Sequence, residues 1–367
     1  MSLLLKQIIS HKNLDSAFSW LKNARKNYPS SSDIWEFRRN WEFAKTNIAN
    51  ALLNNKYKFS CIDKIVCHNK KSINMFCSSD ALVLRAIAQV LNKHLNHKLT
   101  CCHLANKGGI KGAVRKINQN ITEYKYIFKT DIKSYYDTIN HYNLQKQLFS
   151  LIPCTDTVRL IYQSLNININ NGGNYYLKKQ GLIKGSPLSP ILGAIYLKEI
   201  DQKLENSIGN CYIRYMDDFI YLTNKRSLLR KAIKSTYQIL DKLYLSLAKD
   251  KTYIGRTYKV IDFLGYKIKP KKKLRLASKT ISQAALNINL LYEQDRCKKS
   301  IGKYLKYFMS WAKGGIGRRL DNIGVINQLI ESLSKAPFKK TQGKLKNVKI
   351  KRRKISCLKL KLEYLHC

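Results

Sequence analysis

The sequence CYIRYMDDFIYLT, at residues 211–223, places two adjacent carboxylates between two apolar runs. Aromatic and β-branched residues dominate both runs, so the stretch predicts a β-hairpin with Asp217 and Asp218 at its tip. An isolated Asp pair more often serves only the hydrogen bonds of a turn. Turns of that kind favour Asn-Gly or Asp-Gly, however, and this one contains no glycine. Because neighbouring carboxylates repel one another and are usually kept to hold a cation, the hairpin predicts part of a metal site.

The chain is strongly basic. It has 367 residues, with 68 Lys and Arg against 23 Asp and Glu, which gives a formal net charge of +45. A charge of this size indicates a polyanionic partner, most simply nucleic acid. The length and a hydrophobic content of 44% predict more than one subdomain, with a sizeable core.

Neither membrane association nor a zinc ribbon is expected. The sequence has no long apolar run, no lipidation signal and no C-x-x-C pair, and its 10 cysteines are scattered. This pattern is typical of reduced thiols inside the cell. We therefore expect a cytoplasmic protein with no membrane partner.

Stretches before the hairpin predict further elements. Helical spacing of apolar residues predicts one helix over residues 13–26 and a second helix that carries Trp35, Phe37, Trp41, Phe43 and Ala44. The aromatic rings of the second helix are expected in the core, with stacking on nucleic acid as the alternative. YKYIFKTD, at residues 124–131, predicts a strand that ends in Asp131. A carboxylate at the end of a buried strand is a common position for chemistry, although it can also only cap the next turn.

Glycine-containing segments predict turns and close backbone approaches. NKGGIKGAVR, at residues 106–115, predicts a loop that could cradle phosphates or serve as an ordinary turn. QGLIKGSPLSP, at residues 180–190, predicts a rigid start to an apolar helix, where backbone can approach a ligand. Gly172 and Gly173 predict the turn of an Asn-rich hairpin, and FLGYKI, at residues 263–268, predicts a strand.

Four motifs, in their order along the chain, resemble those of the reverse transcriptase family in its bacterial and group II intron-like branch. FKTDIKSYYDTIN, at residues 128–140, is similar to the first catalytic motif, and QGLIKGSPLSP to the motif that faces substrate and template. YMDD, at residues 215–218, is similar to the catalytic hairpin, and FLGYKI to the primer grip. The resemblance covers residues 13–268 and includes DALVLRAI, at residues 80–87, in the finger region.

This resemblance implies an α+β fold, a right-hand polymerase whose fingers and palm contain an antiparallel sheet packed on helices, followed by a helical thumb-like region. The implied domains are N-terminal helices and fingers at residues 1–125 and a palm at residues 126–268, with finger elements interleaved. A helical thumb at residues 269–335 and a basic tail at residues 336–367 complete the chain.

The resemblance also implies a metal site for two Mg²⁺ ions, with Mn²⁺ as an alternative. Asp131 and Asp217 would bind both ions, Asp218 would be a less direct ligand, and the carbonyl of Ile132 would complete one coordination shell. Hard carboxylate oxygens are the ligands that Mg²⁺ prefers. Tyr136 would place its ring against the sugar and disfavour a 2′-hydroxyl, unless it is simply a core residue.

The remaining implied roles concern the nucleotide. Gln180 would contact the incoming nucleotide, with the backbone of Gly181 close by. Lys251, or less favourably Lys249, would protonate the leaving pyrophosphate, and Met216 would shape the primer end by packing.

Basic residues nearer the N-terminus complete the implied site. Lys70, Lys71 and Arg85 would grip triphosphate or template. NKGGIKGAVR would line the template path.

The implied function is that of an RNA-directed DNA polymerase, which transfers dNMP to a 3′-hydroxyl by a two-metal mechanism. Its partners would be an RNA template, a DNA or RNA primer and dNTPs, and a dedicated non-coding RNA is compatible with the sequence. The sequence lacks the retron elements NAxxH and VTG and an acid quartet typical of RNase H, and it most resembles a standalone bacterial enzyme of antiphage defence. An RNA-templated RNA polymerase, and an RNA-binding or maturase-like protein with a vestigial site, are the alternatives. Priming and oligomeric state stay open.

Overall fold

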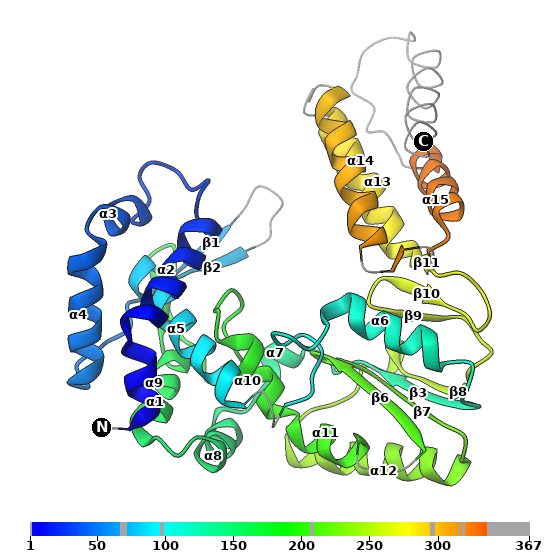
Figure 1. Cartoon of the computed structure of the whole chain (residues 1–367), viewed down its shortest axis with the longest axis horizontal. Coiled ribbons are helices and arrows are strands. Elements are labelled where there is room, and N and C mark those ends of the chain that lie inside the picture. Colours follow the sequence, from blue (N-terminus) through cyan, green and yellow to red (C-terminus); the bar gives the residue numbers. More distant parts are fainter. Residues whose placement is uncertain are drawn as a thin grey trace. The chain divides into compact units, whose positions relative to one another are not determined.

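The computed structural model describes residues 2–66, 72–95, 99–205, 209–293, 298–314, 316–317 and 320–335 (Figure 1). The chain divides into two units, which are described separately below. The first unit contains residues 1–109, 128–221 and 226–253, and the second contains residues 110–127, 222–225 and 254–367. The expected basic tail lies outside the described residues.

A buried helix organises the N-terminal part of the first unit. α5 (Ser78–Leu95) carries the apolar sequence ALVLRAIAQVL, and its buried side chains include Leu82, Ile87 and Leu91. Such a helix needs partners on several sides. The helices that contact it are α1 (Leu3–Ile9), α2 (His11–Ala24), α3 (Ile34–Arg39), α4 (Trp41–Leu53) and α10 (Ser189–Tyr196).

The second predicted helix is divided into α3 and α4. The break lies at Asn40, whose φ of −102° and ψ of 29° are not helical. Trp41 is buried as predicted and stacks on Phe18, with 4.0 Å between ring centroids. The prediction for Phe43 is wrong, because its side chain is 73% exposed.

A mixed sheet in the first unit has the strand order β2-β1-β4-β5. The pair of β1 with β4 is parallel and the other two pairs are antiparallel. Gly172 and Gly173 have φ of +64° and +93°, so the predicted hairpin turn is confirmed. The strands are β1 (Ile62–Val66), β2 (Ser72–Met75), β4 (Asn168–Asn171) and β5 (Asn174–Leu177).

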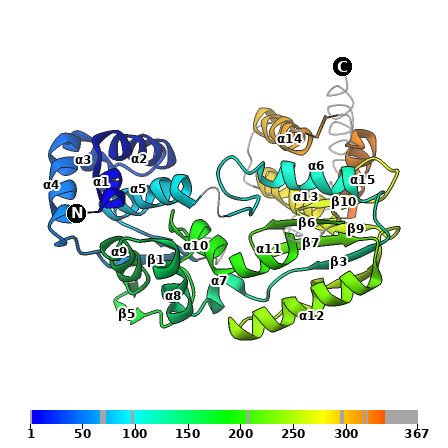
Figure 2. The same cartoon turned by 60° about the horizontal axis from the view of Figure 1, so that its bottom comes forward.

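Another sheet contains the acidic hairpin and has the strand order β6-β7-β3-β8. α11 (Lys198–Glu205) contacts β6 and α12 (Arg226–Lys242), and the two helices lie along one face of the hairpin (Figure 2). The strands are β3 (Tyr126–Thr130), β6 (Asn210–Tyr215), β7 (Asp218–Thr223) and β8 (Tyr253–Arg256). The neighbouring helices are α7 (Tyr135–Thr138), α8 (His141–Leu151) and α9 (Thr155–Leu165), and η1 (Lys249–Lys251) is a short 3₁₀ helix.

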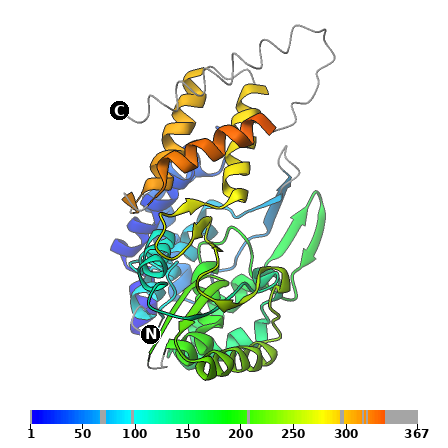
Figure 3. The ribbon, with the colours of Figure 1, turned by 90° about the vertical axis from the view of Figure 1, so that its right-hand side faces the viewer.

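The second unit combines a small antiparallel sheet with helices. The strands β9 (Ile261–Phe263), β10 (Tyr266–Ile268) and β11 (Arg275–Leu276) form this sheet. α13 (Ser278–Glu293) contacts both α14 (Lys298–Lys313) and α15 (Asn322–Lys335), and α15 crosses it (Figure 3).

Two sequence predictions are wrong, one within the second unit and one at a segment that passes from the first unit into the second. FLGYKI is not one strand, because Leu264 and Gly265 have φ of +48° and +85° and form the turn between β9 and β10. The predicted loop NKGGIKGAVR becomes helical at Gly109, where α6 (Gly109–Asn120) begins. Apolar residues at Ala113, Val114 and Ile117 supply the buried face that stabilises this helix.

The expected α+β class, with antiparallel strands packed against helices, is confirmed. Among the described residues, no helix is both long enough and apolar enough to cross a membrane. The boundaries proposed for fingers, palm, thumb and tail stay predictions.

Candidate active site

The acidic hairpin forms as the sequence predicts. β6 ends at Tyr215 and β7 begins at Asp218, so Met216 and Asp217 are the two central residues of the turn. Met216 has φ of +55°, a value that favours glycine. Non-glycine residues in this conformation persist where the surrounding structure holds them, often at functional sites. The hairpin therefore presents its two carboxylates on a constrained turn.

Asp131 follows directly after β3, as expected, and its backbone is held by a segment that leads into η1. Its carbonyl oxygen accepts a hydrogen bond of 2.8 Å from the Ala248 amide, and Ile132 forms a β-bridge with Leu247. This segment continues to Lys251, whose Nζ lies 2.9 Å from Asp131 Oδ1. No described contact joins Lys249 to an aspartate, so the geometry separates the two candidate lysines.

The three aspartates act on one another electrostatically. Burial raises the pKa of Asp217, and the charge of Asp131 adds to this effect. Burial and the same Asp131 charge raise the pKa of Asp218 to about 6. The hydrogen bond to Asp131 raises the pKa of Lys251, which keeps its ammonium protonated.

These groups suit a divalent cation chemically. The described residues include no preassembled cluster of three His, Cys, Asp or Glu ligands. In this structure the ammonium of Lys251 supplies the positive charge beside Asp131. Three mutually repelling carboxylates, two of them with raised pKa values, form a hard-oxygen donor set that fits Mg²⁺ or Mn²⁺.

The backbones of Tyr136 and Gly181 approach each other closely. The Tyr136 hydroxyl donates to the sulfur of Met216 at 3.9 Å, and burial followed by the charge of Asp217 raises its pKa. Gly181 has φ of +85°, and a Cβ there would lie 2.7 Å from the Tyr136 carbonyl oxygen. Only glycine therefore fits at this position. The neighbouring amide of Leu182 donates to the same carbonyl at 2.6 Å.

The turn of the hairpin is held from both sides by residues that the sequence analysis missed. The Met216 amide donates to His103 Nδ1 at 3.2 Å, while Arg214 donates to the Met216 carbonyl at 2.7 Å. His103 Nε2 lies 2.8 Å from the Pro190 carbonyl oxygen and donates to it. Burial lowers the pKa of His103 to about 4, so the ring is neutral at physiological pH. His103 thus connects the start of α10 to the acidic hairpin.

A second missed group steadies the glycine-rich segment. Asp137 pairs with Lys178 at 2.9 Å and with Lys184 at 2.6 Å, one lysine on each side of Gly181. The desolvation cost of partial burial is outweighed by these lysines, which lower the pKa of Asp137. The sequence signal for these ion pairs was the carboxylate that ends KSYYD and the lysines at the two ends of KKQGLIK.

The other predicted residues lie apart from these contacts. Gln180 is exposed. The guanidinium of Arg85 lies 5.0 Å from the ring centroid of Trp20, and none of its described contacts reaches an aspartate. Lys70 and Lys71 lie outside the described residues. The roles proposed for these four residues stay predictions.

The chain is similar in sequence to known proteins. The family described as "Reverse transcriptase (RNA-dependent DNA polymerase)" matches residues 67–268, more than half of the chain. Over 218 residues the chain is 24% identical to "Protein YkfC" of Escherichia coli (strain K12), an alignment that covers 48% of this chain and 57% of that protein. Over 128 residues it is 31% identical to "Uncharacterized 91 kDa protein in cob intron" of Schizosaccharomyces pombe, covering 34% of this chain and 15% of that protein.

Among solved structures, the "Partial Cas6-RT-Cas1--Cas2 complex" is similar with a TM-score of 0.42 and 22% identity, over 65% of this chain and 43% of that chain. Apo telomerase from Candida tropicalis, truncated from its C-terminal domain, is similar with a TM-score of 0.41 and 20% identity, over 51% of this chain and 43% of that chain. The chain spans only 57% and 15% of the lengths of its two curated relatives named above.

Proposed function

The chain belongs to the reverse transcriptase family, and from this membership we propose that it is an RNA-directed DNA polymerase. It would transfer dNMP units to a primer 3′-hydroxyl under the direction of an RNA template. The observation that carries the proposal is the convergence of Asp131, Asp217 and Asp218 in one electrostatic field, with Lys251 bound to the first of them. These carboxylates come from separate segments, and a purely structural turn would not need all three.

Asp131 and Asp217 would hold two Mg²⁺ ions, or Mn²⁺, with Asp218 in a supporting role. Bound there, the ions would supply activation of the 3′-hydroxyl and charge stabilisation of the triphosphate. The raised pKa values of Asp217 and Asp218 support this assignment, because a bound cation offsets both the burial and the neighbouring negative charge that raise them.

The protein's own residues would divide the remaining work. Lys251 is protonated and lies at Asp131, which suits it to give a proton to the departing pyrophosphate. The ring of Tyr136, held against Met216, would exclude a 2′-hydroxyl and favour dNTPs over rNTPs. The absence of a side chain at Gly181 lets its backbone pack against the carbonyls of Tyr136 and Asp137. Exposed Gln180, the preceding residue, would contact the nucleotide.

Primer extension on an RNA template tests the proposal. We expect the full chain to incorporate dNTPs. In the double variant Asp217→Ala/Asp218→Ala we expect the incorporation rate to fall by at least about three orders of magnitude, because residues that act together as one catalytic unit are removed. The matched control is Glu36→Ala/Asp241→Ala, which removes two exposed carboxylates elsewhere. Undiminished synthesis by the first variant would disprove the proposed site.

The same assay separates the alternatives. Preferential rNTP incorporation would indicate an RNA-templated RNA polymerase. RNA binding without incorporation of either nucleotide by the wild-type chain would indicate an RNA-binding or maturase-like protein with a vestigial site. Use of a particular template, a dedicated non-coding RNA and a role in antiphage defence stay predictions of the sequence.

A further inference from the structure

Gly193 is a buried glycine inside a helix whose backbone does not require one. It lies within α10, and its φ is not in the left-handed region that favours glycine. Alanine at such a position stabilises a helix, because glycine is the poorer helix former. The reason for the missing side chain therefore lies in what surrounds Gly193.

Two tyrosine rings lie against Gly193. A Cβ added there would be 3.4 Å from Tyr135 Cε1, 3.5 Å from Tyr136 Cε1 and 3.6 Å from the Tyr136 hydroxyl oxygen. These are ordinary van der Waals separations, so a single methyl group would fit without a clash. The glycine thus leaves a space, about one methyl group in size, behind one edge of the Tyr136 ring.

The helix backbone beside this space is held in place. The carbonyl of Gly193 accepts a hydrogen bond from the buried hydroxyl of Tyr135. The carbonyl of Ala194 accepts another, of 3.2 Å, from Arg214. A group that presses on Tyr136 would therefore move the ring toward Gly193, and not the helix away from the ring.

The ring of Tyr136 is held less firmly than that of its neighbour. Tyr136 is half-buried, and its hydroxyl donates to the sulfur of Met216 over 3.9 Å. A thioether is a weak acceptor on a flexible side chain, so this contact tolerates a small displacement of the ring. Tyr135, by contrast, is buried and bound to a backbone carbonyl.

We propose that Gly193 sets how strictly the Tyr136 ring excludes a 2′-hydroxyl. This role rests on the proposed function, in which the ring faces the sugar of the nucleotide. The space at Gly193 lets the ring recede when a 2′-hydroxyl presses on it, so the wild-type chain discriminates less than a fixed ring would. Gly193 is a positioning residue, because it acts through Tyr136 and does not touch the substrate.

The test measures kcat/KM for dCTP and for CTP in primer extension by the full chain. Gly193→Ala fills the space behind the ring, so the ratio of dCTP to CTP should rise by about tenfold, the lower end of what one methyl group in a pocket contributes. The value for dCTP itself should change little. The matched control is Gly302→Ala in α14, where an added Cβ would meet nothing within 4 Å. The control should leave the ratio unchanged.

Stability separates this role from a purely structural one. Gly193→Ala and Gly302→Ala should both unfold at a higher urea concentration than wild type, because alanine is the better helix former. Only Gly193→Ala should change the ratio. In a Tyr136→Ala background, which lacks the ring, adding Gly193→Ala should leave the ratio unchanged, since residues that act through one another are not additive.

A larger side chain should have a different effect. Gly193→Val exceeds the space, so it should push the ring toward the nucleotide and lower kcat/KM for dCTP, while affinity for primer–template stays as in wild type. An unchanged dCTP value in this variant would contradict the proposal.

Three further results would overturn the proposal. They are an unchanged ratio in an active Gly193→Ala variant, an equal rise of the ratio in the Tyr136→Ala background, and a Gly193→Ala variant less stable than wild type, which would show that the glycine serves packing. Wild-type chain that incorporates neither nucleotide would instead refute the proposed function, and this role with it. The two failures are therefore distinguishable.

Discussion

At the scale of single residues, His103 holds the acidic turn in a conformation that Met216 would not adopt freely. Its Nδ1 accepts from the Met216 amide, while its Nε2 donates to Pro190. The pairing requires a neutral ring with the proton on Nε2. Burial, which lowers the pKa of His103 to about 4, maintains that state. We infer that His103 positions the hairpin and takes no part in chemistry.

Replacing His103 by Phe tests this role, because the ring volume is kept and the hydrogen bonds of both ring nitrogens are lost, including the contact of Nδ1 with Cys101 Sγ at 2.8 Å. The unpaired Met216 amide should lower the free energy of unfolding by about 1–3 kcal/mol. The single-turnover rate of dNTP incorporation should fall by about tenfold or more. A misplaced turn that raises the activation free energy by ~1.4 kcal/mol has that effect.

His103→Gln, which keeps an acceptor and a donor, should recover part of the rate. Affinity for primer–template is the control and should not change in either variant. A rate equal to wild type in His103→Phe would show that the turn needs no such support.

Some site residues were predictable at this scale and others were not. Asp217 and Asp218 stand in a glycine-free turn between strand-forming runs, and the sequence offers no structural reason for them. His103 lies in CCHLANKGG, a segment with no pattern, and its partner Met216 is far away in sequence. A contact between such distant positions depends on the fold and leaves no local signal.

At the scale of elements, a buried ion pair joins the hairpin to α11. Arg214 on β6 donates to both carboxylate oxygens of Asp201, at 2.6 and 2.5 Å, and Tyr212 donates to Asp201 at 2.8 Å. The same guanidinium donates to the carbonyl of Met216. One arginine thus holds the strand, the helix and the turn together.

Asp201→Asn removes the negative charge but leaves Arg214 buried. Removing one partner of a buried pair costs about 3–5 kcal/mol, because the remaining charge is uncompensated. We expect a loss of this size in the free energy of unfolding, measured in urea. A loss below about 1 kcal/mol would mean that water or another group compensates Arg214.

The triple variant Asp201→Leu/Arg214→Met/Tyr212→Phe separates stability from positioning. Apolar replacement of both charged partners, together with removal of the Tyr212 hydroxyl that would lose its acceptor, should restore most of the stability. Activity should stay low, because the Met216 carbonyl still lacks its donor. Recovery of both stability and activity would show that the ion pair is structural only.

Elements were predicted correctly from the sequence where a single spacing of apolar residues or a single turn signal dominates the segment. β3, the acidic hairpin and the Gly172-Gly173 hairpin all follow from strand-forming runs and turn residues. FLGYKI misled because its turn begins at Leu264, an apolar residue with positive φ. Tertiary pairing of Phe263 with Tyr266 overrides that local cost.

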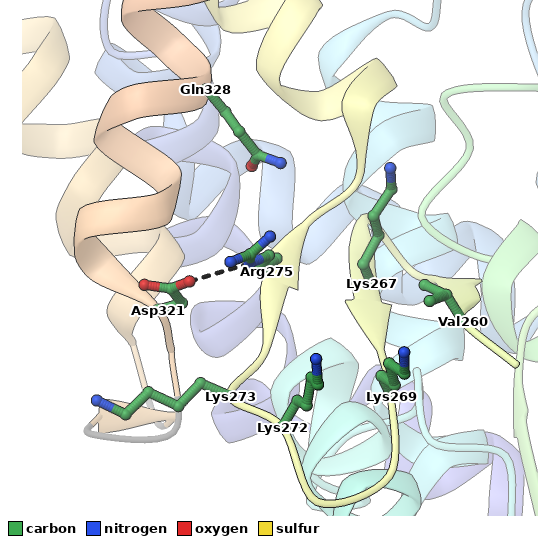
Figure 4. A pocket seen from close by; sticks show the side chains of 8 residues that line it. All are labelled: Val260, Lys267, Lys269, Lys272, Lys273, Arg275, Asp321 and Gln328. Carbon is green, nitrogen blue, oxygen red and sulfur yellow. Dashed lines mark hydrogen bonds and ion pairs between the residues drawn. The ribbon is translucent and has the colours of Figure 1, made fainter. Parts of the chain in front are cut away.

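At the scale of the whole molecule, the net charge of +45 predicted a polyanionic partner but not where the charge would gather. One groove beside α15 is lined by Lys267, Lys269, Lys272, Lys273 and Arg275 (Figure 4). These residues come from β10, the loop after it and β11, and α13 and α14 separate them from α15 in the sequence. Four adjacent or nearly adjacent lysines could be a solvated loop in any basic protein. Only the fold sets them around a cavity.

The free energy of unfolding should depend on both pH and Mg²⁺. The aspartates and His103 change this free energy in opposite directions as the pH rises. The pKa of Asp218 is about 6 in the folded chain, against about 3.9 when unfolded, so the folded state binds more protons between those values. This contribution to stability is therefore present at low pH and is lost as pH rises through about 4 to 6, by on the order of 3 kcal/mol. Asp217 acts in the same sense.

His103 acts in the other direction. Its pKa is about 4 folded, against about 6.5 unfolded, so its contribution is present at neutral pH and is lost as pH falls from about 6.5 to 4. The two effects offset one another in a simple pH profile of stability. A bound cation, by contrast, favours only the charged carboxylates, so the stabilisation that Mg²⁺ provides isolates the aspartates.

We therefore expect Mg²⁺ to raise the free energy of unfolding more at about pH 7.5 than at about pH 5, where protonated Asp218 competes with the ion. Urea unfolding with and without Mg²⁺ at both pH values measures the difference. In Asp217→Ala/Asp218→Ala the Mg²⁺ effect should be small at both pH values, whereas Glu36→Ala/Asp241→Ala should behave as wild type. Equal stabilisation at the two pH values, or an effect that survives loss of both aspartates, would place the cation elsewhere.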